Sequence, residues 1–166
     1  MQLRDNTKKY VLCGVLTAMA LCLSLADMTI SSALSFLPGV KLGLANIVTL
    51  FALYRLGGKY AAVITAARCL LAGILSGMIT MMFFSLAGGF LSLFVMLLLK
   101  NKISEIKLSV TGGIAHNCGQ MIVAVFITST AAVAWELPLL IVFGCISGFA
   151  MGIVCKIVLK RIKIKP

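Results

Sequence analysis

Acidic residues are scarce in this chain: its 166 residues include only four aspartates and glutamates, and no two of them are near each other in the sequence. It therefore has no carboxylate pair for acid–base catalysis or for Mg²⁺-diphosphate chemistry. There is one histidine, and a single imidazole cannot form a metal site. No GxxxxGK[ST] motif is present, because Leu53 stands where the GGK at 57–59 would need its first glycine. We therefore expect neither an enzyme that acts alone nor a bound cofactor.

Cysteine pairs with metal or redox spacing are also missing. None of the six cysteines forms a CxxC pair, and all six lie within apolar runs. This pattern indicates neither a zinc site nor a disulfide framework. We interpret these residues as small buried hydrophobes.

Apolar residues dominate what is present. The chain is 61% hydrophobic and 11% charged, with a mean hydropathy of +1.14, whereas soluble domains carry about 25% charged residues. The composition therefore predicts an all-α integral membrane protein. Most of the net charge of +11 lies at the edges of apolar segments, where it indicates orientation and contact with lipid headgroups rather than nucleic-acid binding.

Apolar runs bounded by charges or turn residues predict a single transmembrane domain over 1–166. We interpret the first run as an uncleaved helix rather than a signal peptide. The boundary between the third and fourth spans has only glycine to mark it, so a five-span alternative that fuses this region stays open. The six predicted helices cover about 10–32, 41–56, 60–80, 82–99, 109–134 and 137–160.

The distribution of basic residues predicts the orientation. In the six-span arrangement, 13 of the 15 lysines and arginines lie at one end of the helices, and the positive-inside rule places that end, with both termini, in the cytoplasm. Trp135 beside Glu136 fits an interfacial anchor at the opposite end. Only Lys41 and Arg68 are left unexplained by topology.

Two helices carry small residues at every fourth position, a spacing that lets helix backbones approach closely in lipid. In the last helix, Gly144, Gly148 and Gly152 favour packing inside the monomer. In the first helix, packing inside the monomer and docking to another membrane subunit are both open. Its four small residues are Gly14, Ala18, Cys22 and Ala26.

Polar side chains within the spans are candidates for a binding site. Arg68 lies deep in its helix, where a charge contacts a ligand or polar network unless it snorkels to the interface. Asp27, near the outer end of the first helix, is the nearest acid that could pair with Arg68. His116 and Gln120 share a helix face and Asn117 is adjacent, so a polar cavity and hydrogen bonding between helices are both open.

The segment LPGVKLGLAN at 37–46 adds Lys41 and Asn46. If the second helix begins near Lys41, its N-terminal amides would also favour an anion. Together with Arg68 and His116, these donors point to an anionic or acceptor-rich ligand. The alternative is that Lys41 is an anchor at the headgroups.

The string PGVKLGLANIVTLFALYRLGGKYA at 38–61, followed by Arg68 and GGIAHNCGQ, resembles the Gx transporter family, also known as component I of heptaprenyl diphosphate synthase. That family is similar to the substrate-binding S components of energy-coupling factor (ECF) transporters. The resemblance implies a bundle of six helices that binds a small nutrient near the outer face. It also implies partnership with a T subunit and two ATPases.

The resemblance gives roles to residues found above. The stripe Gly14/Ala18/Cys22/Ala26 corresponds in kind to an AxxxA docking face, although only two of the four are alanine. Lys41 falls on the loop that closes over substrate in S components. The aspartate-rich motifs of prenyl diphosphate synthases are missing here, so any role in that synthesis would be accessory.

Three hypotheses follow. The first is an uptake subunit that binds a small anionic substrate near Lys41, Asn46, Arg68, His116, Asn117 and Gln120. The second is a non-catalytic membrane subunit of heptaprenyl diphosphate synthesis that contacts a prenyl diphosphate or the soluble synthase. The third is a structural membrane subunit whose polar residues only join helices.

Overall fold

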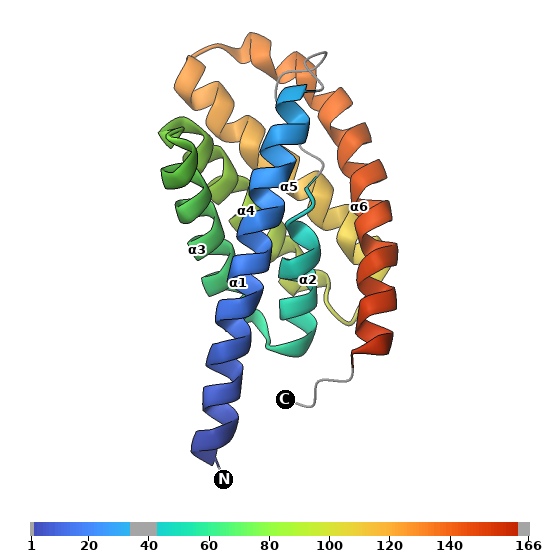
Figure 1. Cartoon of the computed structure of the whole chain (residues 1–166). Helices are drawn as coiled ribbons and strands as arrows, with labels where there is room; N and C mark the ends of the chain where they lie inside the picture. The colour runs from blue at the N-terminus through green and yellow to red at the C-terminus, as the bar shows by residue number, and fades with distance from the viewer. Residues whose placement is uncertain (1, 34–42, 163–166) are drawn as a thin grey trace.

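The computed structural model describes residues 2–33 and 43–162, and over these ranges it is a bundle of helices (Figure 1). This confirms the prediction of an all-α membrane protein. Five helices are long and apolar enough to cross a bilayer: those at 7–30, 58–76, 79–99, 105–128 and 131–161. The elements are α1 (Gln2–Ala33), α2 (Asn46–Arg55), α3 (Gly58–Ser76), α4 (Ile79–Leu99), α5 (Glu105–Thr128), the 3₁₀ helix η1 (Ala131–Glu136) and α6 (Leu137–Arg161).

The second helix is shorter than the sequence predicted. It was expected over 41–56, but α2 has 10 residues and begins at Asn46. At 1.5 Å per residue it extends about 15 Å, half of a hydrocarbon core of about 30 Å. Gly43, with φ +67°, opens the turn before it. The first amides of α2 bond to the carbonyls of Gly43, Leu44 and Ala45, so they are not directed at a ligand as expected.

The short helix α2 forms the centre of the bundle. It contacts each of the other five α-helices, and six consecutive residues, 48–53, are buried. A helix that is apolar on every side belongs in an interior. Figure 1 shows α2 beside α1, starting partway along it and descending to the end where α1 begins and α6 ends.

The segments α3 and α4 are two separate helices, so the alternative that fuses this region is wrong. The described residues nevertheless hold five candidate spans instead of the six predicted, because α2 is too short to cross the bilayer. Gly77 adopts a left-handed conformation with φ +67° and caps the C-terminal end of α3, as glycine commonly does. The fifth helix ends at Thr128 instead of 134, because Ser129 turns left-handed with φ 52° and a 3₁₀ helix follows. The first helix begins at Gln2, earlier than the predicted residue 10.

Glycines bring α5 close to both of its main neighbours, α4 and α6. A Cβ added at Gly113 would lie 2.6 Å from the carbonyl oxygen of Gly144, and one added at Gly88 would lie 2.6 Å from that of His116. The glycines of α6 are buried against α5, which confirms internal packing for that stripe.

The small residues of α1 behave differently. Gly14, Ala18, Cys22 and Ala26 are all exposed in the monomer, and a Cβ at Gly14 would meet nothing within 4 Å. Of the two interpretations of this stripe, packing inside the monomer is wrong.

Two basic residues cap helices at the end where α1 begins. The Arg55 Nη2 group donates to the carbonyls of Leu159 and Ile162 at the end of α6. Lys100 Nζ donates to the carbonyl of Leu53, at 2.7 Å, near the end of α2. Cations favour the carbonyl ends of helices, so these residues stabilise the bundle in addition to any role in orientation.

Candidate functional site

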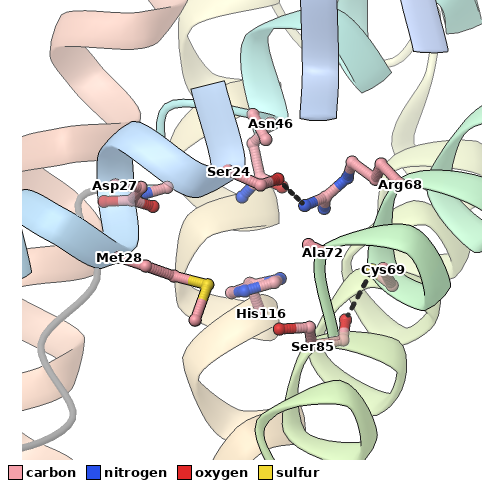
Figure 2. Close-up of a pocket in the computed structure, with 11 residues that line it drawn as sticks. Ser24, Asp27, Met28, Asn46, Arg68, Cys69, Ala72, Ser85 and His116 are labelled. Carbon is pink, nitrogen blue, oxygen red and sulfur yellow. Dashed lines mark hydrogen bonds between the residues drawn. The ribbon is translucent and has the colours of Figure 1, made fainter. Parts of the chain in front are cut away.

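A small polar pocket lies in the middle of the bundle, where α1, the turn before α2, α3, α4 and α5 meet (Figure 2). Its volume is about 20 Å³, which is room for about one water molecule. It is lined by Ser24, Asp27, Met28, Gly43, Ala45, Asn46, Arg68, Cys69, Ala72, Ser85 and His116.

Arg68 supplies the positive charge of this pocket. It lies midway along α3 and is only 5% exposed. Its Nη1 group donates to Ser24 Oγ of α1 at 3.2 Å, the dashed line in Figure 2. The other two guanidinium nitrogens, Nε and Nη2, are buried without a hydrogen-bond partner in the part of the chain that the structure describes. The Arg68 side chain therefore does not snorkel to the membrane interface.

The helix α1 forms one wall of the pocket through Ser24, Asp27 and Met28, which share a face because they are three or four residues apart. The Asp27 carboxylate is 5% exposed and accepts a hydrogen bond from the Gly43 amide at 2.9 Å. This bond ties α1 to the turn that opens α2. Asp27 was the nearest candidate acid for Arg68; both residues line the pocket, and the hydrogen bond from Arg68 goes to Ser24.

His116 of α5 enters the pocket from the opposite wall, and its ring lies between Met28 and Ser85 in Figure 2. Its Nε2 atom is 3.2 Å from Gln120 Nε2, and both side chains are buried. This contact links the imidazole to the next turn of α5. His116 thereby offers the pocket a polar group that Gln120 orients.

The structure divides the predicted site residues into three groups. Asn46, Arg68 and His116 line the same pocket, although they come from three different helices. Gln120 does not line the pocket, and neither does Asn117. Lys41 lies outside the described residues.

Asn117 holds two helices together. Its Nδ2 group donates to the carbonyl of Leu140 in α6 at 2.6 Å, and the side chain is 3% exposed. A Cβ added to Gly144 would lie 2.9 Å from that same nitrogen. The Asn117 amide therefore fills the space beside Gly144 and forms a contact between α5 and α6.

Replacing Asn117 with leucine should destabilise the fold by about 1–2 kcal/mol, because it removes a buried hydrogen bond and presses a branched side chain against Gly144. Thermal unfolding in a mild detergent measures this loss. Ligand binding at a permissive temperature should stay within about twofold of wild type. A stable variant that no longer binds ligand would instead place Asn117 in the site.

Sequence reasoning missed Ser24, Met28 and Ser85 as pocket residues. Serine and methionine are common in apolar helices, so neither residue is conspicuous before the helices are packed. The available signal was the spacing of Ser24, Asp27 and Met28, which places three non-aliphatic residues on one face of an otherwise apolar helix.

No group of three or more histidine, cysteine, aspartate or glutamate side chains that could hold a metal occurs among the described residues. All six cysteines are free thiols.

Comparison with known proteins gives one family. A family model described as heptaprenyl diphosphate synthase component I matches residues 16–158. No curated protein and no solved structure matches the chain. The match runs from near the middle of α1 almost to the end of α6, and so covers every pocket residue. The chain belongs to the heptaprenyl diphosphate synthase component I family.

Proposed function

We propose that this chain is a non-catalytic membrane subunit that binds a ligand in the Arg68 pocket and serves heptaprenyl diphosphate synthesis. The observation that carries the binding role is Arg68, a residue only 5% exposed at the centre of the bundle, two of whose guanidinium nitrogens have no hydrogen-bond partner among the described residues. Charges at membrane depth are costly and are retained where they act on a ligand or partner. The synthetic context comes from the family description.

A non-catalytic role fits the side chains available. Of the four acids in the sequence, Asp27 alone lines the pocket, and one carboxylate cannot assemble the metal-bound diphosphate site of a prenyl transfer reaction. Bond formation would take place on a soluble synthase partner, and this chain would supply that partner with a membrane site. We place it in the plasma membrane of a bacterium, with the end that carries most basic residues toward the cytoplasm.

Reconstitution tests this proposal. The soluble synthase subunit is assayed with the chain in lipid nanodiscs and with empty nanodiscs, and product chain lengths are compared by mass spectrometry. Full-length product should require the chain or increase at least severalfold with it. Identical product length and yield with empty nanodiscs would rule the synthetic role out.

A second candidate function is an uptake subunit of the ECF type, favoured by the exposed small residues of α1. Gly14, Ala18, Cys22 and Ala26 leave one face of this helix open to a neighbouring helix, and such faces suit helix association in lipid. The partners would be a T subunit and ATPases, because this chain has no ATPase motif of its own.

Gly14→Leu should separate this second candidate from the first. Since nothing lies within 4 Å of a Cβ at Gly14, the variant should fold as wild type does, yet it should lose a co-expressed T subunit in pull-down by tenfold or more. The matched control is Val15→Leu, an exposed neighbour off the stripe. No T-subunit complex with the wild-type chain, or equal recovery with Gly14→Leu, would count against docking through this face.

A further inference from the structure

The arrangement of the Arg68 guanidinium indicates which kind of chemical group it binds. The Nε–H and one Nη2–H bond of an arginine point the same way, and their spacing matches two oxygens of a carboxylate or a phosphate. In this structure that edge is the unpartnered one. The remaining nitrogen, Nη1, is engaged by Ser24 Oγ at 3.2 Å, which orients the group.

A purely structural role for Arg68 leaves this edge unexplained. Two buried donors without partners, on a charged group in the middle of a membrane span, are strongly unfavourable. A side chain needed for packing alone would be apolar here, as the neighbouring Ala72 and Ile64 are. A ligand oxygen pair on Nε and Nη2 would satisfy both donors and the charge.

The charge of the pocket limits the charge of the ligand. Among the described lining residues, Arg68 is the single lysine or arginine and Asp27 is the single acidic residue. Arg68 attracts a negatively charged group, whereas the Asp27 carboxylate repels each of its charges, so a singly charged group is favoured over a diphosphate with two or three charges. The ligand-free pocket, at about 20 Å³, has room for about one water molecule, so it must widen to admit even a compact group of this kind.

From these observations we propose that the Nε/Nη2 edge of Arg68 binds side-on to a singly charged, two-oxygen anion, a carboxylate or a phosphate monoester. This specifies the ligand class of the binding role proposed above, and it rests on that role. Asn46, Ser85 and His116, on the other walls of the pocket, would contact the remainder of the ligand through their polar groups.

The side-chain resonances of arginine report directly on this contact. The chain has four arginines: Arg4, Arg55, Arg68 and Arg161. In ¹⁵N-labelled full-length protein in nanodiscs, the Arg68 Nε–H signal is assigned by its loss in Arg68→Lys. The protein is then titrated with acetate, with methyl phosphate and with inorganic diphosphate. A pH of about 5.5 keeps methyl phosphate mostly singly charged, because its second pKa is about 6.

Acetate, methyl phosphate or both should move the Arg68 signal downfield in a saturable manner, and the response distinguishes a carboxylate ligand from a phosphate ester. Diphosphate should bind about tenfold more weakly or worse, because one cation cannot neutralise it. The exposed Arg161→Lys control should leave the Arg68 titration unchanged.

An Arg68 signal that moves with none of the three anions, or that responds best to diphosphate, would overturn this inference. Either result would leave the reconstitution assay unaffected, because that assay measures product formation by the soluble subunit. The ligand class and the synthetic role can therefore fail separately.

Discussion

Replacing Arg68 with methionine is expected to stabilise the ligand-free chain while abolishing its ligand binding. Arg68 is 5% exposed, and its Nε and Nη2 atoms have no hydrogen-bond partners in the described part of the chain. Its removal should therefore recover a desolvation cost, as apolar replacements of buried charges often do. We expect a gain of about 1–2 kcal/mol in the free energy of unfolding, since loss of the Ser24 bond and of attraction to Asp27 offsets part of a larger gain.

Binding should respond in the opposite direction. Two charge-assisted hydrogen bonds and an ionic contact would be lost, so affinity should fall by about 100-fold or more. Thermal unfolding in detergent and ligand titration of the same preparations measure the two effects together. The exposed Arg161→Met is the control and should change neither. A variant that unfolds more easily than wild type and still binds would show that Arg68 is a structural residue.

Replacing Gly113 with alanine is expected to give the largest loss of stability of any single methyl group added to α5 or α6. The new Cβ would lie 2.6 Å from the carbonyl oxygen of Gly144 and 3.4 Å from its carbonyl carbon. Both atoms belong to the backbone, so α6 must move outward along its contact with α5. Overpacking of this kind costs about 2–3 kcal/mol.

Gly14→Ala is the matched control for this substitution, because it adds the same methyl group to an open helix face. It should leave stability unchanged or raise it by less than about 1 kcal/mol through helix propensity. Both variants are compared with wild type by thermal unfolding. Equal stability of the two variants would contradict the close approach of α5 and α6.

The extent to which the sequence predicted the fold differs among the helices. The long spans α3, α4 and α6 lie within a few residues of their predicted ranges, because an apolar run of about 20 residues has few alternatives in a membrane. The helix α2 was predicted to begin at 41, five residues before it does. The helix α2 lies in apolar surroundings on every side. The hydropathy of the sequence therefore does not show at which residue of this buried segment the helix begins.

The candidate site was predictable only where a residue was conspicuous by itself. Arg68 stands out as a charge within a span, and His116 as the single histidine. Asn117 is equally conspicuous but faces α6, since residues adjacent in sequence lie about 100° apart around a helix. Ser24 and Met28 belong to the pocket because α1 packs beside α3, and that packing is a tertiary property that the sequence pattern did not reveal.

Native mass spectrometry of gently purified wild-type protein, compared with Arg68→Met, tests most directly whether the Arg68 pocket binds a ligand. We expect a fraction of the wild-type protein to carry a small bound anion and Arg68→Met, folded and at least as stable, to carry none. Identical spectra for the two proteins, both bare or both with the same adduct, would contradict this expectation.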